Sequence, residues 1–250
     1  MFINYKKYFG KTVLVVTAHT DDADYNCGAA VARLSDAGAR VVYVVCTKGE
    51  KGTMDRALSA DALVRARRDE QDAANRILGV SETIHFDYPD GELKADFELQ
   101  GHLTALIREL RPELMLAFDP EWPEHRQHPD HRACAVAAIR ANSFSPLFQY
   151  FPEQVEGGAE PFQCPLILLF DVFRNPDTFV PVGSMFRRKC DAMFAHESQI
   201  AHLLNDDRKK MLETFMKIPF DAAKQLLIGA FAPAFIVETF RALRAGDTLR

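Results

Sequence analysis

One stretch of the sequence passes directly from an apolar run to charged side chains: Val13-Leu14-Val15-Val16-Thr17-Ala18-His19-Thr20-Asp21-Asp22. The β-branched run does not alternate with polar residues, which is typical of a strand buried on both faces of a parallel sheet. Open α/β sheets bind their ligands in the crevice beyond the carboxyl ends of such strands. His19 and Asp22 can converge on one point in a tight turn, with Asp21 between them. The stretch therefore predicts a parallel sheet with a metal site and an adjacent base at its edge.

Strand and helix patterns alternate through the first two-thirds of the chain. This βαβα order predicts a parallel sheet with right-handed crossovers. We therefore expect a Rossmann-like α/β fold with flanking helices, in one domain spanning residues 1–250, and a C-terminal extension packed on the same domain. A loop rich in Phe, Pro and Gly is expected from Ser143 to Pro165. The predicted strands cover residues 12–17, 40–46, 83–86, 113–118, 166–170 and 178–182, and the predicted helices cover residues 28–37, 61–78, 97–110, 129–141, 184–205, 207–217 and a segment near Ala222.

The composition is that of a globular protein that can bury a sizeable core. Hydrophobic residues make up 48% and charged residues 26% of the 250 residues, which are ordinary proportions. A net charge of −5 and a pI near 5.9 give no electrostatic case for nucleic acid. The segment closest to a membrane span, Leu226–Ile236, is too short and contains Pro233. We expect neither nucleic acid nor a membrane as a partner.

The five cysteines are scattered, and none lies in a Cys-x-x-Cys pair. This usage argues against a disulfide framework and against a thiolate zinc site. Cys27 follows the acidic turn and could be a nucleophile, but a small buried thiol at a helix start is the commoner arrangement. Residues Met1–Phe9 lack the apolar core of a signal peptide. Together these features predict a reduced, cytoplasmic protein.

A second polar cluster follows the predicted strand 113–118. It ends in His128-Pro129-Asp130-His131, where the two histidines bracket a helix start. A His-x-x-His pair alone is more often a solvated helix face. Catalytic zinc sites, however, usually take three protein ligands from His and Asp/Glu and keep a fourth position open. His19, Asp22 and one histidine of this pair would supply that set, so the two clusters together predict a metal site.

At these two motifs the chain resembles the PIG-L/LmbE-type zinc-dependent deacetylases, which remove acetyl groups from molecules that contain N-acetylglucosamine. Ala18-His19-Thr20-Asp21-Asp22, with Cys27-Gly28 downstream, is similar to their Ala-His-Pro-Asp-Asp-Glu signature, and His128-Pro129-Asp130-His131 matches their second signature. Further similarities follow in the same order along nearly the whole chain, at Lys48-Gly49-Glu50, Arg67 to Glu70, Leu78-Gly79-Val80, Asp87 to Leu93, Lys189, His196 to Gln199 and Glu238 to Phe240.

The resemblance implies a role for each residue of the two motifs. His19, Asp22 and His131 would bind Zn²⁺ or another divalent metal. Asp21 would be the general base for the metal-bound water, and His128 would stabilise the oxyanion or protonate the leaving amine. The enzyme would thus hydrolyse the acetyl amide of an N-acetylated amino sugar or its conjugate.

Two further residues are candidates for binding the sugar. Arg67 and Asp90 could bind its hydroxyl groups. A charge on a helix surface and a turn-forming Pro-Asp-Gly sequence explain the same two residues equally well. The expected partner is in either case a small molecule.

Five residues depart from the family pattern and bear on substrate and activity rather than on the metal. Thr20 replaces a proline, Ala23 replaces a glutamate, Asn26 stands where glycine is common, and Arg126-Gln127 replaces an acidic residue. Two alternatives therefore stay open. One is a zinc-dependent hydratase or lyase for a small carboxylated substrate, which would show arginines around the metal. The other is a catalytically silent relative that binds a ligand or partner.

The nineteen phenylalanines are concentrated in the second half of the chain. We expect them to build that half of the core. Because aromatic residues are also enriched in interfaces, a homo-oligomer is the alternative.

Overall fold

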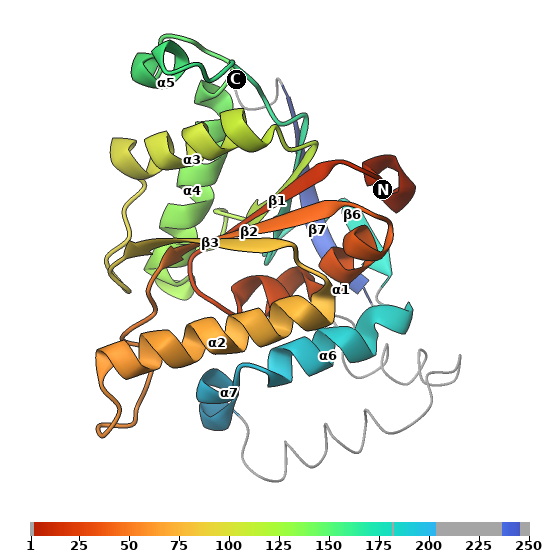
Figure 1. Cartoon of the computed structure of the whole chain (residues 1–250). Helices are drawn as coiled ribbons and strands as arrows, with labels where there is room; N and C mark the ends of the chain where they lie inside the picture. The colour runs from red at the N-terminus through yellow and green to blue at the C-terminus, as the bar shows by residue number, and fades with distance from the viewer. Residues whose placement is uncertain (1–2, 182, 204–236, 246–250) are drawn as a thin grey trace.

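The described strands form one mixed sheet (Figure 1). The computed structural model describes residues 3–181, 183–203 and 237–245. In this part of the chain the strand order is β3-β2-β1-β4-β5-β7-β6. Strands β1 to β5 pair in parallel, and β7 is antiparallel to both β5 and β6. The strand bounds are β1 Thr12–Thr17, β2 Arg40–Thr47, β3 Glu82–Tyr88, β4 Leu114–Phe118, β5 Leu166–Phe170, β6 Thr178–Pro181 and β7 Val237–Arg244.

Helices cover both faces of the sheet (Figure 1). Helices α3 and α4 pack together on one face, and α1, α2 and α6 pack together on the other, with α7 against α2. Within the described ranges, no helix has both the length and the apolar character needed to cross a membrane. The helix bounds are α1 Asp22–Asp36, α2 Ala60–Leu78, α3 Phe97–Leu110, α4 Pro129–Phe144, α5 Pro152–Glu156, α6 Phe186–Phe194 and α7 Glu197–Leu203, with 3₁₀ turns at Tyr5–Tyr8, Glu124–Arg126 and Gly183–Met185.

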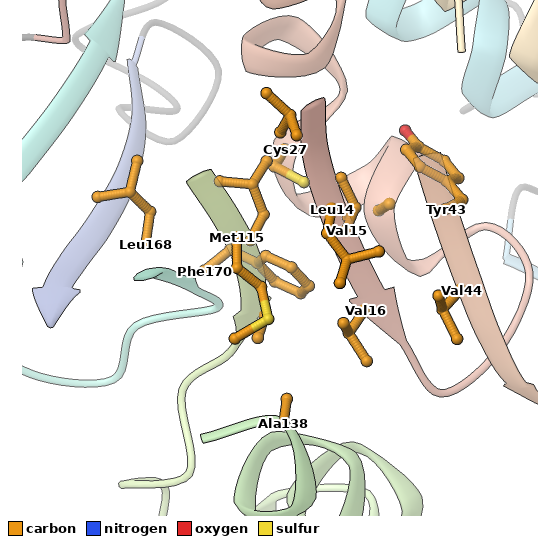
Figure 2. Close-up of a cluster of buried hydrophobic side chains, with 14 of the residues drawn as sticks. Leu14, Val15, Val16, Cys27, Tyr43, Val44, Met115, Ala138, Leu168 and Phe170 are labelled. Atoms are coloured by element: carbon orange, nitrogen blue, oxygen red, sulfur yellow. The ribbon is translucent and has the colours of Figure 1, made fainter. Parts of the chain in front are cut away.

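The hydrophobic core lies against both faces of the central strands. Leu14, Val15 and Val16 of β1 are fully buried. Figure 2 shows them between α1, which carries Cys27, and α4, which carries Ala138. Because helices shield both faces from water, the strand bears apolar side chains at successive positions. The prediction of a strand buried on both faces is confirmed.

The order of the strands reverses between β1 and β4. From β1 the chain proceeds to β2 and β3 on one side, and from β4 it proceeds to β5 on the other. At such a reversal the connections diverge and leave a crevice beyond the carboxyl ends of the two strands. His19 follows β1, and His128 and His131 follow β4. The topology therefore directs both histidine motifs toward one crevice.

The predicted α/β sheet with flanking helices is confirmed, but it is not entirely parallel. The C-terminal strand β7 inserts between β5 and β6 and runs antiparallel to both. No strand was predicted at residues 237–244, since its pairing partners are distant in the sequence. The expected loop from Ser143 to Pro165 contains the short helix α5. The predicted helix over residues 184–205 is divided into α6 and α7, and the helices predicted over residues 207–217 and near Ala222 lie outside the described residues.

Helix α1 begins earlier than the predicted residue 28, at Asp22, and is kinked at Cys27, whose φ of −135° is not helical. Beyond the kink, the N–H groups of Ala29 and Ala30 donate to the two carboxylate oxygens of Glu238, at 2.8 and 2.7 Å. Lys189 pairs with the same carboxylate at 2.7 Å. A strand residue far away in the sequence thus caps the second half of this helix.

Candidate metal centre and active site

The carboxylate of Asp22 lies between two imidazoles. Its Oδ2 is 3.5 Å from Nδ1 of His19, and its Oδ1 is 3.2 Å from Nε2 of His131. Oδ2 also accepts a hydrogen bond of 2.7 Å from the backbone N–H of His19. His19 belongs to the turn after β1, Asp22 begins α1, and His131 lies in the first turn of α4. The three residues expected to bind the metal are therefore brought together at the crevice.

Two further carboxylates orient the imidazole of His19. Its Nε2 lies 3.0 Å from Oδ1 of Asp90 and 3.2 Å from Oδ2 of Asp130. Asp130 is fully buried and also accepts hydrogen bonds from the backbone N–H groups of Gly91 and Leu93, at 2.7 and 3.1 Å. With Nε2 held by these carboxylates, Nδ1 is directed toward Asp22. Carboxylate–imidazole pairs of this kind fix the ring orientation of metal-binding histidines.

The donor set fits a divalent metal ion. One donor atom from each of His19, His128 and His131 lies within 4.8 Å of the other two, and the same holds for His19, Asp90 and Asp130. Imidazole and carboxylate are ligands that zinc takes in catalytic sites. The shared residue of both groups is His19, and Asp22 contacts two of the three histidines. The residues present can therefore hold a metal between the two motifs.

The protonation states reflect the crowding of charges. Burial disfavours the imidazolium of His19, but hydrogen bonds to Asp130, Asp22 and Asp90 outweigh it and raise the pKa of His19 to about 12. Burial also disfavours the charged form of His131, but the carboxylate of Asp22 more than compensates for it, so the pKa of His131 is raised. His19 is therefore protonated near neutral pH when no metal is bound, and the shift at His131 favours its charged ring as well. Because a metal binds the neutral ring, metal binding must release protons.

Asp21 lies at the edge of this cluster in an unusual conformation. Its φ is +79°, a left-handed value that residues with a β-carbon seldom adopt. Its backbone N–H donates to Oε1 of Gln71 at 3.1 Å, and its Oδ1 is 3.7 Å from Nη2 of Arg67. Burial and the charge of Asp22 raise the pKa of Asp21 to about 6, while Arg67 opposes the shift. A carboxylate with this pKa can accept a proton near neutral pH.

His128 precedes α4 and is exposed. Its Nδ1 accepts a hydrogen bond of 3.2 Å from the backbone N–H of Asp130, so the proton of the neutral ring resides on Nε2. Partial desolvation of the ring and the charges of His19 and His131 lower the pKa of His128. The ring centroids of His128 and His19 are 4.9 Å apart. His128 can therefore present an N–H donor beside the cluster.

The two residues expected to bind sugar hydroxyls are both engaged within the protein. Asp90 contacts His19 and accepts from the backbone N–H of Lys51 at 3.2 Å. The guanidinium of Arg67 donates to Thr20 and Gly49. Arg67 is therefore not a solvated charge on a helix surface, and Asp90 does more than form a turn. Their binding of sugar stays a prediction.

The departures from the family pattern are accommodated locally. The hydroxyl of Thr20 accepts a hydrogen bond from Arg67, and Ala23 is buried in the first turn of α1. The amide of Gln127 donates to the carbonyl of Asp119 at 2.7 Å. Trp122 donates from Nε1 to the carbonyl of Asp171 and packs on Phe173, with 4.7 Å between ring centroids.

Sequence reasoning missed three residues that support the site. Asp130 was noticed only as part of the histidine motif, although its place between two candidate ligands was a signal. Gln71 follows Arg67 by four residues, so both lie on one face of α2. Asp24, buried beneath the acidic turn, accepts hydrogen bonds from Gln71, His196 and Tyr43. No local pattern indicates the contacts of Gln71 and Asp24, because their partners come from other elements.

Comparisons with known proteins agree with this geometry. The sequence model of the GlcNAc-PI de-N-acetylase (PIG-L) family matches residues 14–142, which include both histidine motifs. Diacetylchitobiose deacetylase from Thermococcus kodakarensis is 32% identical over 189 residues, or 76% of this chain and 70% of that protein.

Solved structures extend the likeness to the fold. N,N'-diacetylchitobiose deacetylase from Pyrococcus horikoshii, in complex with an inhibitor, has a TM-score of 0.80 and 29% identity, covering 97% of this chain and 88% of that chain. The 4-carboxy-2-hydroxymuconate hydratase GalB from Pseudomonas putida has a TM-score of 0.67, covering 93% and 96% of the two chains; its 22% identity shows the shared fold alone. The family match and the Thermococcus relative establish that the chain belongs to the GlcNAc-PI de-N-acetylase (PIG-L) family.

Proposed function

We propose that this protein is a metal-dependent hydrolase that removes the acetyl group from an N-acetylated amino sugar or its conjugate. The observation that carries the proposal is the position of Asp22 between His19 and His131, with Asp21 and His128 beside it. Membership of the family and the names of its relatives support the same reaction.

We propose His19, Asp22 and His131 as the metal ligands and zinc as the metal. Their imidazole and carboxylate donors, and the outer contacts that orient His19, support this choice. When bound, zinc would polarise the acetyl carbonyl and lower the pKa of a water molecule to about 7. Another divalent metal with the same ligands is the alternative.

Asp21 and His128 are the proposed proton acceptor and hydrogen-bond donor of the reaction. Asp21 takes a proton from the attacking water as the new C–O bond forms, which its raised pKa favours. His128 donates a hydrogen bond from Nε2 to the carbonyl oxygen as negative charge develops there. The C–N bond then breaks, the leaving nitrogen receives the proton, and the products are acetate and the free amine.

The hydratase alternative expects arginines around the metal. Arg67 is 3.7 Å from Asp21, and its guanidinium already donates to Thr20 and to the carbonyl of Gly49. This contact pattern favours the deacetylase. A small amino-sugar substrate also accords with the names of the relatives.

The test is amine release from a panel of N-acetylglucosamine conjugates that includes N,N'-diacetylchitobiose. We expect release by the metal-loaded protein, and its loss in Asp21→Asn with the metal content unchanged. Hydration of an unsaturated carboxylate without amine release would instead favour the hydratase. Binding of the conjugates without any turnover would favour a silent relative.

We also propose a single domain over residues 1–250 and a reducing, cytoplasmic environment. The pairing of β7 with β5 supports the first proposal, because it unites the C-terminal strand with the sheet. All five cysteines are buried free thiols, which supports the second. Homo-oligomerisation stays a prediction.

A further inference from the structure

Two side chains on one face of α2 reach the turn that carries Asp21. Arg67 and Gln71 are four residues apart and therefore neighbours on the helix surface. Arg67 donates to the hydroxyl and the carbonyl of Thr20, at 2.8 and 3.2 Å. Gln71 accepts from the N–H of Asp21 at 3.1 Å. Both residues of the turn are thus hydrogen-bonded to side chains of the same helix.

The guanidinium of Arg67 is enclosed by protein. It is 4% exposed, and its third hydrogen bond goes to the carbonyl of Gly49 at 3.1 Å. A β-carbon at Gly49 or Gly52 would lie 2.8 or 2.5 Å from guanidinium atoms, so the loop backbone rests directly on this group. Three of the five N–H groups of Arg67 thus donate to protein acceptors, two of them in Thr20, so the guanidinium is oriented toward the turn.

The amide of Gln71 has a defined orientation. Its Nε2 donates to Oδ2 of Asp24 at 3.0 Å and to Oδ1 of Asn75 at 3.1 Å. Because the backbone N–H of Asp21 is a donor, the oxygen of Gln71 must face it. Asp24 is itself held by His196 and Tyr43 at 2.8 and 3.0 Å. The oxygen and the nitrogen of the Gln71 amide thus both make hydrogen bonds within the protein, and these fix its orientation.

The turn needs such support. Asp21 has φ +79°, which is unfavourable for a residue with a β-carbon and persists only when its surroundings impose it. The contacts of α2 hold both ends of the peptide group that precedes this residue: Arg67 binds the carbonyl oxygen of Thr20, and Gln71 binds the N–H of Asp21. Loss of either contact would let the carboxylate of Asp21 turn away.

We propose that Arg67 and Gln71 are positioning residues that hold the Thr20–Asp21 turn and so aim the carboxylate of Asp21 at the reacting water. Thr20 takes part through its hydroxyl, an acceptor that the proline of the family signature would not supply. The inference rests on the proposed function, in which Asp21 is the base.

Positioning and sugar binding have different kinetic consequences. If Arg67 binds the sugar, its replacement raises KM. If it aims the base, its replacement lowers kcat at unchanged KM, since only the transition state loses an interaction. Misplacing a reacting group by about 1 Å can cost on the order of a hundredfold in rate.

The test compares Thr20→Val, Thr20→Ser, Arg67→Lys and Gln71→Met with the metal-loaded wild type, using amine release from N,N'-diacetylchitobiose. Thr20→Val keeps the shape of the side chain but removes the acceptor for Arg67. We expect kcat to fall about 10- to 100-fold in Thr20→Val, Arg67→Lys and Gln71→Met, with KM and metal content close to those of the wild type. Thr20→Ser should restore kcat to near the wild-type value.

The double variant Thr20→Val/Arg67→Lys adds a test that does not depend on how much each change destabilises the fold. Its kcat should be close to that of the worse single variant, because both changes break the same contact. Arg68→Met is the control: Arg68 is the next residue on α2, is half-exposed and pairs with Asp87 instead, so its kcat should not change.

Two results would overturn the inference. One is a raised KM with unchanged kcat in Arg67→Lys, and the other is an unchanged kcat in Thr20→Val. Asp21→Asn separates this failure from that of the proposed function. If Asp21→Asn is inactive while the α2 variants keep their kcat, only the positioning role is wrong. If Asp21→Asn keeps its kcat, the assignment of the base fails and the inference with it.

Discussion

Oδ1 of Asp22, at the start of α1, lies 3.2 Å from Nε2 of His131, in the first turn of α4. The two helices follow β1 and β4, the strands at which the sheet order reverses. A carboxylate from one βα unit therefore meets an imidazole from the other at the crevice that this topology creates. The candidate metal centre depends on the fold as a whole, although each half is a short local motif.

Metal binding should release protons and depend on His131. The pKa of His19 is raised to about 12, so its ring is protonated near neutral pH in the metal-free protein, and the raised pKa of His131 favours the charged form of that ring too. Zinc affinity should therefore rise with pH, and calorimetry in buffers of different ionisation enthalpy should detect proton release. His131→Ala should lose more affinity than the roughly 10- to 100-fold typical of outer contacts. His125→Ala, a change at an exposed histidine of the same loop, is the control, and an equal loss there would contradict the assignment.

Asp130 should matter for the metal without touching it. Its carboxylate accepts from Gly91 and Leu93 and lies 3.2 Å from Nε2 of His19. Asp130→Asn should weaken zinc binding by about 10- to 100-fold, because it removes an anionic partner that orients His19. Competition with a chromophoric chelator measures this change. An affinity equal to that of the wild type would show that Asp90 alone orients the ring.

The buried pair Lys189–Glu238 should be important for stability. The two side chains are 9% and 1% exposed, and Glu238 also receives the N–H groups of Ala29 and Ala30. Glu238→Ala leaves all of these donors unpaired and should lower the free energy of unfolding by about 3–5 kcal/mol. The control is Glu82→Ala, which breaks the exposed pair with Arg40 (48% and 50% exposed) and should cost less than about 1 kcal/mol. Urea titration compares them, and equal losses would refute the capping role of Glu238.

His196 should stabilise the protein most at acidic pH. Burial lowers its pKa, but the hydrogen bond and charge of Asp24 outweigh burial and raise the pKa of His196 above its usual value. A raised pKa contributes stability below the unfolded-state value of about 6.5 and loses it as the pH increases through the folded-state value. The difference in unfolding free energy between wild type and His196→Gln should therefore be larger near pH 5.5 than near pH 9. A difference independent of pH would mean that the pKa of His196 is the same in the folded and the unfolded protein.

Several features of the fold and site could be predicted because their causes are local. The unbroken apolar run of β1 revealed its burial, and the polar residues after β1 and β4 marked one edge of the sheet. That is why His19, Asp22 and one histidine of the pair His128/His131 could be expected to meet, while the choice of His131 came from the family resemblance.

Other features depend on residues far apart in the chain. The kink at Cys27 is stabilised by Glu238, and β7 finds its place only by pairing with β5 and β6. The contact of Gln71 with Asp21 likewise depends on how α2 packs beside the turn. Nothing in the neighbouring sequence encodes such pairings, so they emerge only from the three-dimensional structure.

The central claim is that a metal held by His19, Asp22 and His131 enables release of an amine from an N-acetylated amino sugar. The most direct measurement follows amine release from N,N'-diacetylchitobiose by chelator-treated protein while Zn²⁺ is added back. The account predicts no turnover without metal, recovery that saturates at one zinc per chain in the wild type, and no recovery in His131→Ala at the same zinc concentration. Turnover that survives metal removal, or that His131→Ala recovers as fully as the wild type, would contradict it.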